Sequence, residues 1–107
     1  MSKAAELANL IGNINAGGGG VNRNVIINGN MSVAQRGTSF TGLGGSTGAV
    51  YTLDRFHTFD GATAGRATVT QDSSAPSGFA NSLKLACTTA DTSIAAGEIF
   101  VLAQRIE

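Results

Sequence analysis

The densest group of residues that could do chemistry is D-R-F-H-T-F-D at residues 54–60. It holds Asp54, His57 and Asp60, which are residue types that bind metal ions. Side chains alternate between the two faces of a strand, so Asp54 and Asp60 share one face and His57 points to the other. Three ligands cannot converge on such a strand without a bulge. We therefore expect no metal site.

A catalytic nucleophile is also hard to build from this sequence. Cys87 is the single cysteine and His57 the single histidine, so an internal disulfide framework is excluded. Alternation places Cys87 on the face of Leu83 and Leu85, which predicts a small, buried apolar side chain. No G-x-S-x-G motif is present, and the seven acidic residues suggest no glycosidase pair. We expect no catalytic residues, no cofactor and no enzymatic activity.

Aromatic side chains offer one further kind of chemistry, the stacking of a sugar ring. Tyr51 and Phe56, with polar neighbours, are the candidates for a sugar contact. Phenylalanine in a strand is more often part of the core, and the chain has no Trp and one Tyr. A carbohydrate-binding module is thus an alternative interpretation of the chain.

The composition limits the elements that could position such residues. Gly, Ala, Thr, Ser and Asn supply 59 of the 107 residues, whereas Leu, Ile, Val and Phe supply 25. This excludes a leucine-rich helical bundle and a coiled coil. The net charge is zero, which argues against nucleic-acid binding, and no apolar run is long enough for membrane insertion. The length allows one domain.

The N-terminal residues 1–15 contain the one helix candidate, residues 2–14. Its apolar residues have helical spacing and form one stripe, which we expect to dock on another subunit or in a groove of another protein: Leu7, Leu10, Ile11 and Ile14. Ser2 can cap this helix. The glycine-rich residues 16–21 predict a flexible linker.

Residues 22–107 have the pattern of an antiparallel β-sandwich, so the fold class is mostly β after a short helix. Asn28-Gly29 is a hairpin signal, and residues 37–50, with five glycines, are expected to form a loop. The expected strands are residues 24–27, 31–35, 51–59, 66–71, 81–88 and 98–106. The last strand is strongly apolar and runs to Glu107, which predicts that a longer chain continues the sandwich.

Two segments resemble a known group of proteins. Residues 22–40, N-R-N-V-I-I-N-G-N-M-S-V-A-Q-R-G-T-S-F, resemble the N-R-N-x-I-I-N-G…Q-R-G-T-S-F opening of many tailed-phage fibre and other virion proteins. Residues 51–56, Y-T-L-D-R-F, are similar to their Y-T-x-D-R-[FW] strand. Residues 2–12 are similar to the short N-terminal helix of such fibres.

This resemblance implies a jelly-roll-like sandwich in a structural protein of a phage virion. It implies the N-terminal part of a tail fibre, attached to the tail and assembled as a homotrimer in the bacterial cytoplasm. The implied partners are other copies of the chain, phage tail or capsid proteins and host surface glycans. A capsid decoration or head-fibre protein with the same fold is a further alternative.

Overall fold

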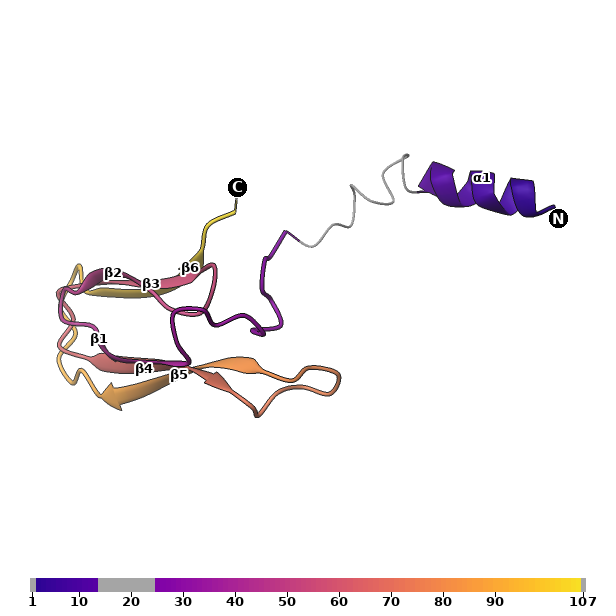
Figure 1. Ribbon diagram of the computed structural model, residues 1–107. Coiled ribbons are helices and arrows are strands. Elements are labelled where there is room, and N and C mark those ends of the chain that lie inside the picture. The colour runs from indigo at the N-terminus through magenta and orange to yellow at the C-terminus, as the bar shows by residue number, and fades with distance from the viewer. Residues whose placement is uncertain (1, 14–24, 107) are drawn as a thin grey trace.

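The structure, a computed structural model, describes residues 2–13 and 25–106, the side chains of residues 10–13 excepted (Figure 1). Within these residues the chain forms a helix, α1 (Lys3–Asn13), followed by strands only. The strands are β1 (Ser39–Leu43), β2 (Gly48–Tyr51), β3 (Phe56–Gly61), β4 (Arg66–Asp72), β5 (Ser82–Thr89) and β6 (Ile99–Gln104).

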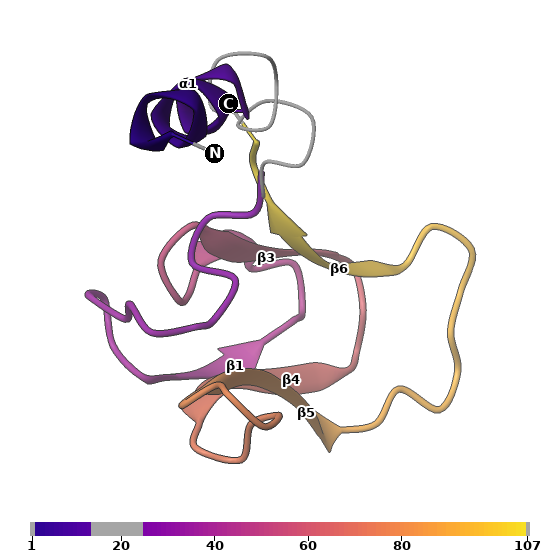
Figure 2. The same ribbon diagram turned by 90° about the vertical axis from the view of Figure 1, so that its right-hand side faces the viewer.

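Helix α1 begins at the predicted cap. The hydroxyl of Ser2 accepts a hydrogen bond from the backbone N–H of Ala5 at 3.3 Å, and Glu6 in the first turn has the charge that a helix N-terminus favours. The helix lies clear of both sheets (Figures 1 and 2). No helix among the described residues has the length and apolar character needed to cross a membrane.

The strands of the described residues form two layers that face each other (Figure 1). One sheet has the order β1-β4-β5 and the other the order β2-β3-β6, and every pairing is antiparallel. The predicted fold class, mostly β and antiparallel after a short helix, is confirmed. The two sheets form a sandwich that is not closed.

The core lies between the layers and is small. Its buried apolar side chains are Leu43, Leu53, Ala67 and Val69. Asp60 is also buried, at 2% exposure, and its carboxylate accepts hydrogen bonds from the hydroxyl and the backbone N–H of Thr47. These two bonds compensate for the loss of water around a buried charge.

The sandwich has a closed side and an open side. On the closed side, β1 and β2 follow each other in the chain and lie in opposite sheets, and the core is on this side. On the open side, β5 and β6 are the outer strands. Val69 of β4 is 0% exposed, whereas Leu85, its neighbour across the β4–β5 ladder, is 45% exposed.

Three of the predicted strand assignments are wrong. Residues 25–27 and 31–35 belong to no strand, and residues 37–50, expected to form a loop, contain β1 and most of β2. Residues 51–59 are not one strand, because a turn at residues 52–55 separates β2 from β3. In this turn the N–H of Phe56 donates to the carbonyl of Leu53 at 2.8 Å, and Arg55 has a φ of 73°.

The glycines of residues 37–50 allow strands to turn and do not mark one long loop. Gly44 and Gly45 have φ values of 121° and 77°, which a residue with a Cβ rarely adopts. A Cβ on Gly44 would overlap the carbonyl oxygen of Gly65. The predicted linker, residues 16–21, lies outside the described residues.

Candidate functional site

Residues 25–38 carry most of the phage-like motif and are held to the β domain largely by side chains. The Asn28 amide donates to the carbonyls of Val33 at 2.9 Å and Asp54 at 3.0 Å, and its oxygen accepts from the N–H of Val33 at 2.9 Å. Asn28 adopts a φ of 59°, and the N–H of Met31 donates to its carbonyl. The predicted turn at Asn28-Gly29 is therefore present, but it joins no two strands.

Asp54 ties the second motif to the first. Its carboxylate accepts the N–H of Gln35 at 2.7 Å, and its own N–H lies 3.4 Å from the carbonyl of Val33. The Asp54 side chain is half-buried, and this bond to the backbone satisfies one of its carboxylate oxygens.

Two glutamine side chains take the place of a neighbouring strand. The Gln104 amide donates to the carbonyl of Ile27 at 2.6 Å and accepts the N–H of Ile27 at 3.1 Å. The Gln71 amide donates to the carbonyl of Met31 at 2.6 Å. We call the bonds made by Asn28, Asp54, Gln71 and Gln104 the amide seam. The sequence analysis missed both glutamines, because a single Gln at a strand end has no distinctive sequence signal.

The residues considered for metal binding are not brought together. Asp60 points between the sheets, His57 points to the outer face of β3, and Asp54 lies in the turn before that strand. Among the described residues no three His, Cys, Asp or Glu side chains form a group that could hold a metal ion.

The residues considered for sugar contact lie on opposite faces of one sheet. Tyr51 is on the outer face and 44% exposed, with the Arg36 guanidinium 5.3 Å from its ring centre and the His57 ring at 5.4 Å. Phe56 points between the sheets and lines a hollow with Met31. The two rings therefore cannot contact the same sugar.

The docking stripe is only partly described. Leu7 is 57% exposed, as a docking residue would be before its partner arrives. Leu10 and Ile11 belong to α1, but their side chains lie outside the described part of the structure, as does the whole of Ile14.

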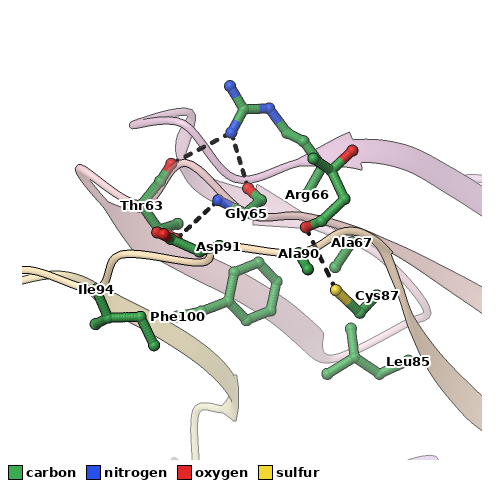
Figure 3. A pocket seen from close by; sticks show the side chains of 11 residues that line it. Thr63, Gly65, Arg66, Ala67, Leu85, Cys87, Ala90, Asp91, Ile94 and Phe100 are labelled. Atoms are coloured by element: carbon green, nitrogen blue, oxygen red, sulfur yellow. Dashed lines mark hydrogen bonds between the residues drawn. The ribbon is translucent and has the colours of Figure 1, made fainter.

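Two hollows lie between the sheets on the open side. The larger, of about 430 Å³, is lined by Leu85 and Cys87 of β5, Phe100 of β6 and Ile94 of the connection between them (Figure 3). The smaller, of about 370 Å³, is lined by Leu83 and Leu102 among others. Both are mainly apolar, which suits side chains of a protein partner better than a polar ligand.

The polar groups beside the larger hollow are used within the chain. Arg66 points away from the apolar lining and donates to the carbonyls of Thr63 and Gly65 at 3.2 and 2.8 Å (Figure 3). Asp91 accepts the N–H of Ser93 at 3.0 Å, and this bond is the main reason that its pKa is lowered. Neither group is arranged to select a ligand.

The prediction of a buried Cys87 is wrong. Cys87 does lie on the face of Leu85, but its side chain is exposed, because it lines the open hollow between β5 and β6. Its thiol lies 3.4 Å from the carbonyl of Thr89. Since His57 is on the outer face of the other sheet, the two residues form no catalytic pair.

Comparison with known proteins finds no relative of this chain. The chain matches no protein-family model, no curated protein and no solved structure.

Proposed function

We propose that this chain is a structural component of a phage virion, the N-terminal part of a tail fibre. In this proposal α1 attaches the chain to the tail, three copies assemble together, and the β domain supports host recognition. The observation that carries the proposal is α1 itself. It is a capped helix that lies clear of both sheets and exposes Leu7, so this residue of the predicted stripe is available to a partner.

The amide seam also supports a structural role. Two residues of the phage-like motifs hold the backbone in place. The amide of Asn28 donates to the carbonyl of Asp54, and the carboxylate of Asp54 accepts the N–H of Gln35. A motif used for catalysis would instead leave polar side chains free to meet a substrate. Here the motif polar groups named above are satisfied by the protein backbone.

The anchoring part of the proposal is tested by placing charges on α1 in the intact phage. Leu7→Glu with Leu10→Glu charges the apolar stripe, and we expect incorporation into particles to fall at least about tenfold, because each buried charge would lack a partner. Ala5→Glu with Asn9→Glu adds two charges on the opposite side and is the matched control. Equal incorporation of both variants would overturn the anchoring role.

A carbohydrate-binding module is the second candidate, and the exposed Tyr51 beside Arg36 favours it. The test is binding of the intact chain to host cell-wall glycans, compared with Tyr51→Ala. Loss of binding in Tyr51→Ala would support a sugar site on the outer face of β2. Absence of binding by the unchanged chain would remove this candidate.

A capsid decoration or head-fibre protein would use the same helix and β domain. Imaging of virions that carry labelled chains distinguishes these two functions. Label at the tail would support the tail fibre, whereas label on the head would overturn it in favour of a decoration or head-fibre protein.

A further inference from the structure

The open side of the sandwich has an outer strand with a free edge in each sheet. Among the described residues β5 pairs only with β4, and β6 pairs only with β3. Both outer strands lie on the same side of the molecule, where the connection between them runs from one sheet to the other (Figure 2). An outer strand presents a row of backbone N–H and C=O groups that can pair with another extended chain. The open side therefore offers backbone partners to an additional strand.

The two hollows follow each other along these outer strands. Leu85 of β5 and Phe100 of β6 line the larger hollow, whereas Leu83 and Leu102, two residues away on each strand, line the smaller one. Residues i and i+2 of a strand lie on the same face, about 6.8 Å apart. The step from one hollow to the other therefore corresponds to a step of two residues along a strand.

These two features together define the chemistry of an occupant. A strand laid along the free edge of β5 would bond to its backbone, and two alternate side chains of that strand would enter the two hollows. The linings are mainly apolar, so these two side chains would be apolar as well. An α-helix fits less well, because its backbone groups are bonded within the helix and would leave the edge of β5 unpaired.

We propose that the open side is a docking site for an extended strand of a partner polypeptide, which pairs with β5 and inserts two alternate apolar side chains into the hollows. β5 is the longer outer strand, with 8 residues against 6 in β6. The added strand would cover Leu85, which is 45% exposed in the free chain. In this mode of recognition, backbone bonds provide affinity and side-chain pockets provide specificity.

This inference goes beyond the proposed function, because it concerns the open side of the β domain and not α1. Failure of the anchoring test on α1 would leave it standing, and its own failure would leave the anchoring role standing.

The test is hydrogen exchange of the intact chain, followed in β5 by mass spectrometry, with a panel of synthetic peptides as probes. Each peptide has the length of β5, with Val, Leu, Ile or Phe at alternate positions and Thr or Gln between them. We expect at least one peptide, at saturation, to slow exchange in β5 at least about tenfold, because ladder bonds protect the amides. No protection by any peptide of the panel would overturn the proposal.

Two control peptides test the mode of binding. A peptide of the same composition with its apolar residues in one block lacks the alternation and should not protect β5. A peptide of unchanged sequence with an N-methylated backbone keeps its side chains but lacks the donors of a ladder, so it should not protect β5 either. Equal protection by either control would contradict the pairing of an alternating strand.

A pair of variants locates the binding site. Leu85→Glu places a charge in the larger hollow and should abolish the protection, whereas Ser39→Glu, at an exposed position on the opposite outer strand of the same sheet, should not. Because Leu85 is already partly exposed, the new carboxylate can reach water, and exchange in β4 checks that both variants remain folded. Protection that survives Leu85→Glu would show that the peptide binds elsewhere.

The thiol of Cys87 provides a second measurement, because it is exposed and lines the larger hollow. A bound peptide should slow its reaction with a thiol reagent at least about tenfold, since only an accessible thiolate reacts. Unchanged reactivity would mean that the hollow stays empty and would overturn the insertion. A reaction that slows as the concentration of the chain alone rises would identify a second copy as the occupant, in place of a separate partner.

Discussion

The closed and open sides of the β domain leave the same type of residue in different environments. Leu53, in the turn between β2 and β3, is 0% exposed, whereas Leu85 of β5 is 45% exposed. Leu85 points between the sheets, as alternation predicts. The difference arises because Leu85 lines the open hollow between β5 and β6. Alternation therefore predicts the direction of a side chain, but coverage depends on what lies opposite it.

The largest expected effect is on the closed side. Leu53→Ala removes a fully buried side chain from a small core and should lower the free energy of unfolding by about 3 kcal/mol. Urea denaturation of the intact chain measures this loss. A loss below about 1 kcal/mol would mean that the closed side is no better packed than the open side.

The amide seam is expected to contribute less to the free energy of unfolding than the closed side and more than the open side. Asn28→Ala removes three hydrogen bonds and should cost about 1–2 kcal/mol. The matched control is Asn30→Ala, since Asn30 makes one local bond to the N–H of Ser32 at 3.3 Å; it should cost less than about 0.5 kcal/mol. Equal denaturation midpoints for the two variants would show that the seam adds no stability.

A smaller effect is expected on the open side. Leu85→Ala makes the same chemical change as Leu53→Ala, but the side chain is already 45% exposed. We expect a loss below about 1 kcal/mol, because less apolar area is removed from the protein interior. A loss equal to that of Leu53→Ala would contradict the difference between the closed and open sides. It would indicate that the hollows on the open side are filled in solution.

The smallest effect concerns the charged pair at the end of the β4–β5 ladder. The N–H of Ser74, and then Lys84 at 3.5 Å, lower the pKa of Asp72 from its ordinary value of 3.8. A depressed folded-state pKa contributes stability above about pH 3.8, and this contribution is lost as the pH falls through the lower, folded value.

Denaturation of the unchanged chain and of Asp72→Asn between pH 2 and 7 measures this contribution. The two midpoints should differ slightly near neutral pH and converge in acid. A difference that grows in acid would show that the sign is wrong.

The sequence predicted the parts of the fold that depend on local pattern. Helix α1 follows the spacing of its leucines, and β4, β5 and β6 follow alternation or apolar runs. The errors lie at residues 25–59. There Ile27 bonds to a glutamine side chain where a strand would offer its backbone, and Gly44 and Gly45 allow the turn between β1 and β2. Both features depend on residues distant in sequence, Gln104 and Gly65.

For the candidate residues, the face of the sheet on which each side chain lies was predicted better than its burial and its neighbours. His57 and Asp60 lie on opposite faces of β3, as expected. Tyr51 and Phe56 were both candidates for a sugar contact, but they lie on opposite faces of the sheet, as alternation along one strand would also have placed them. The turn between β2 and β3 was missed, because a single-sequence pattern does not show that Arg55 adopts a positive φ.

The bonds between Ile27 and Gln104 also determine when residues 25–38 can be held in place during synthesis of the chain. They join residues 77 positions apart, and a ribosome releases the N-terminal end first. Residues 25–38 therefore cannot be fixed at this point until β6 has emerged. Until then, α1 is attached to a chain that has not made this contact, so the nascent helix is available before residues 25–38 are held in place.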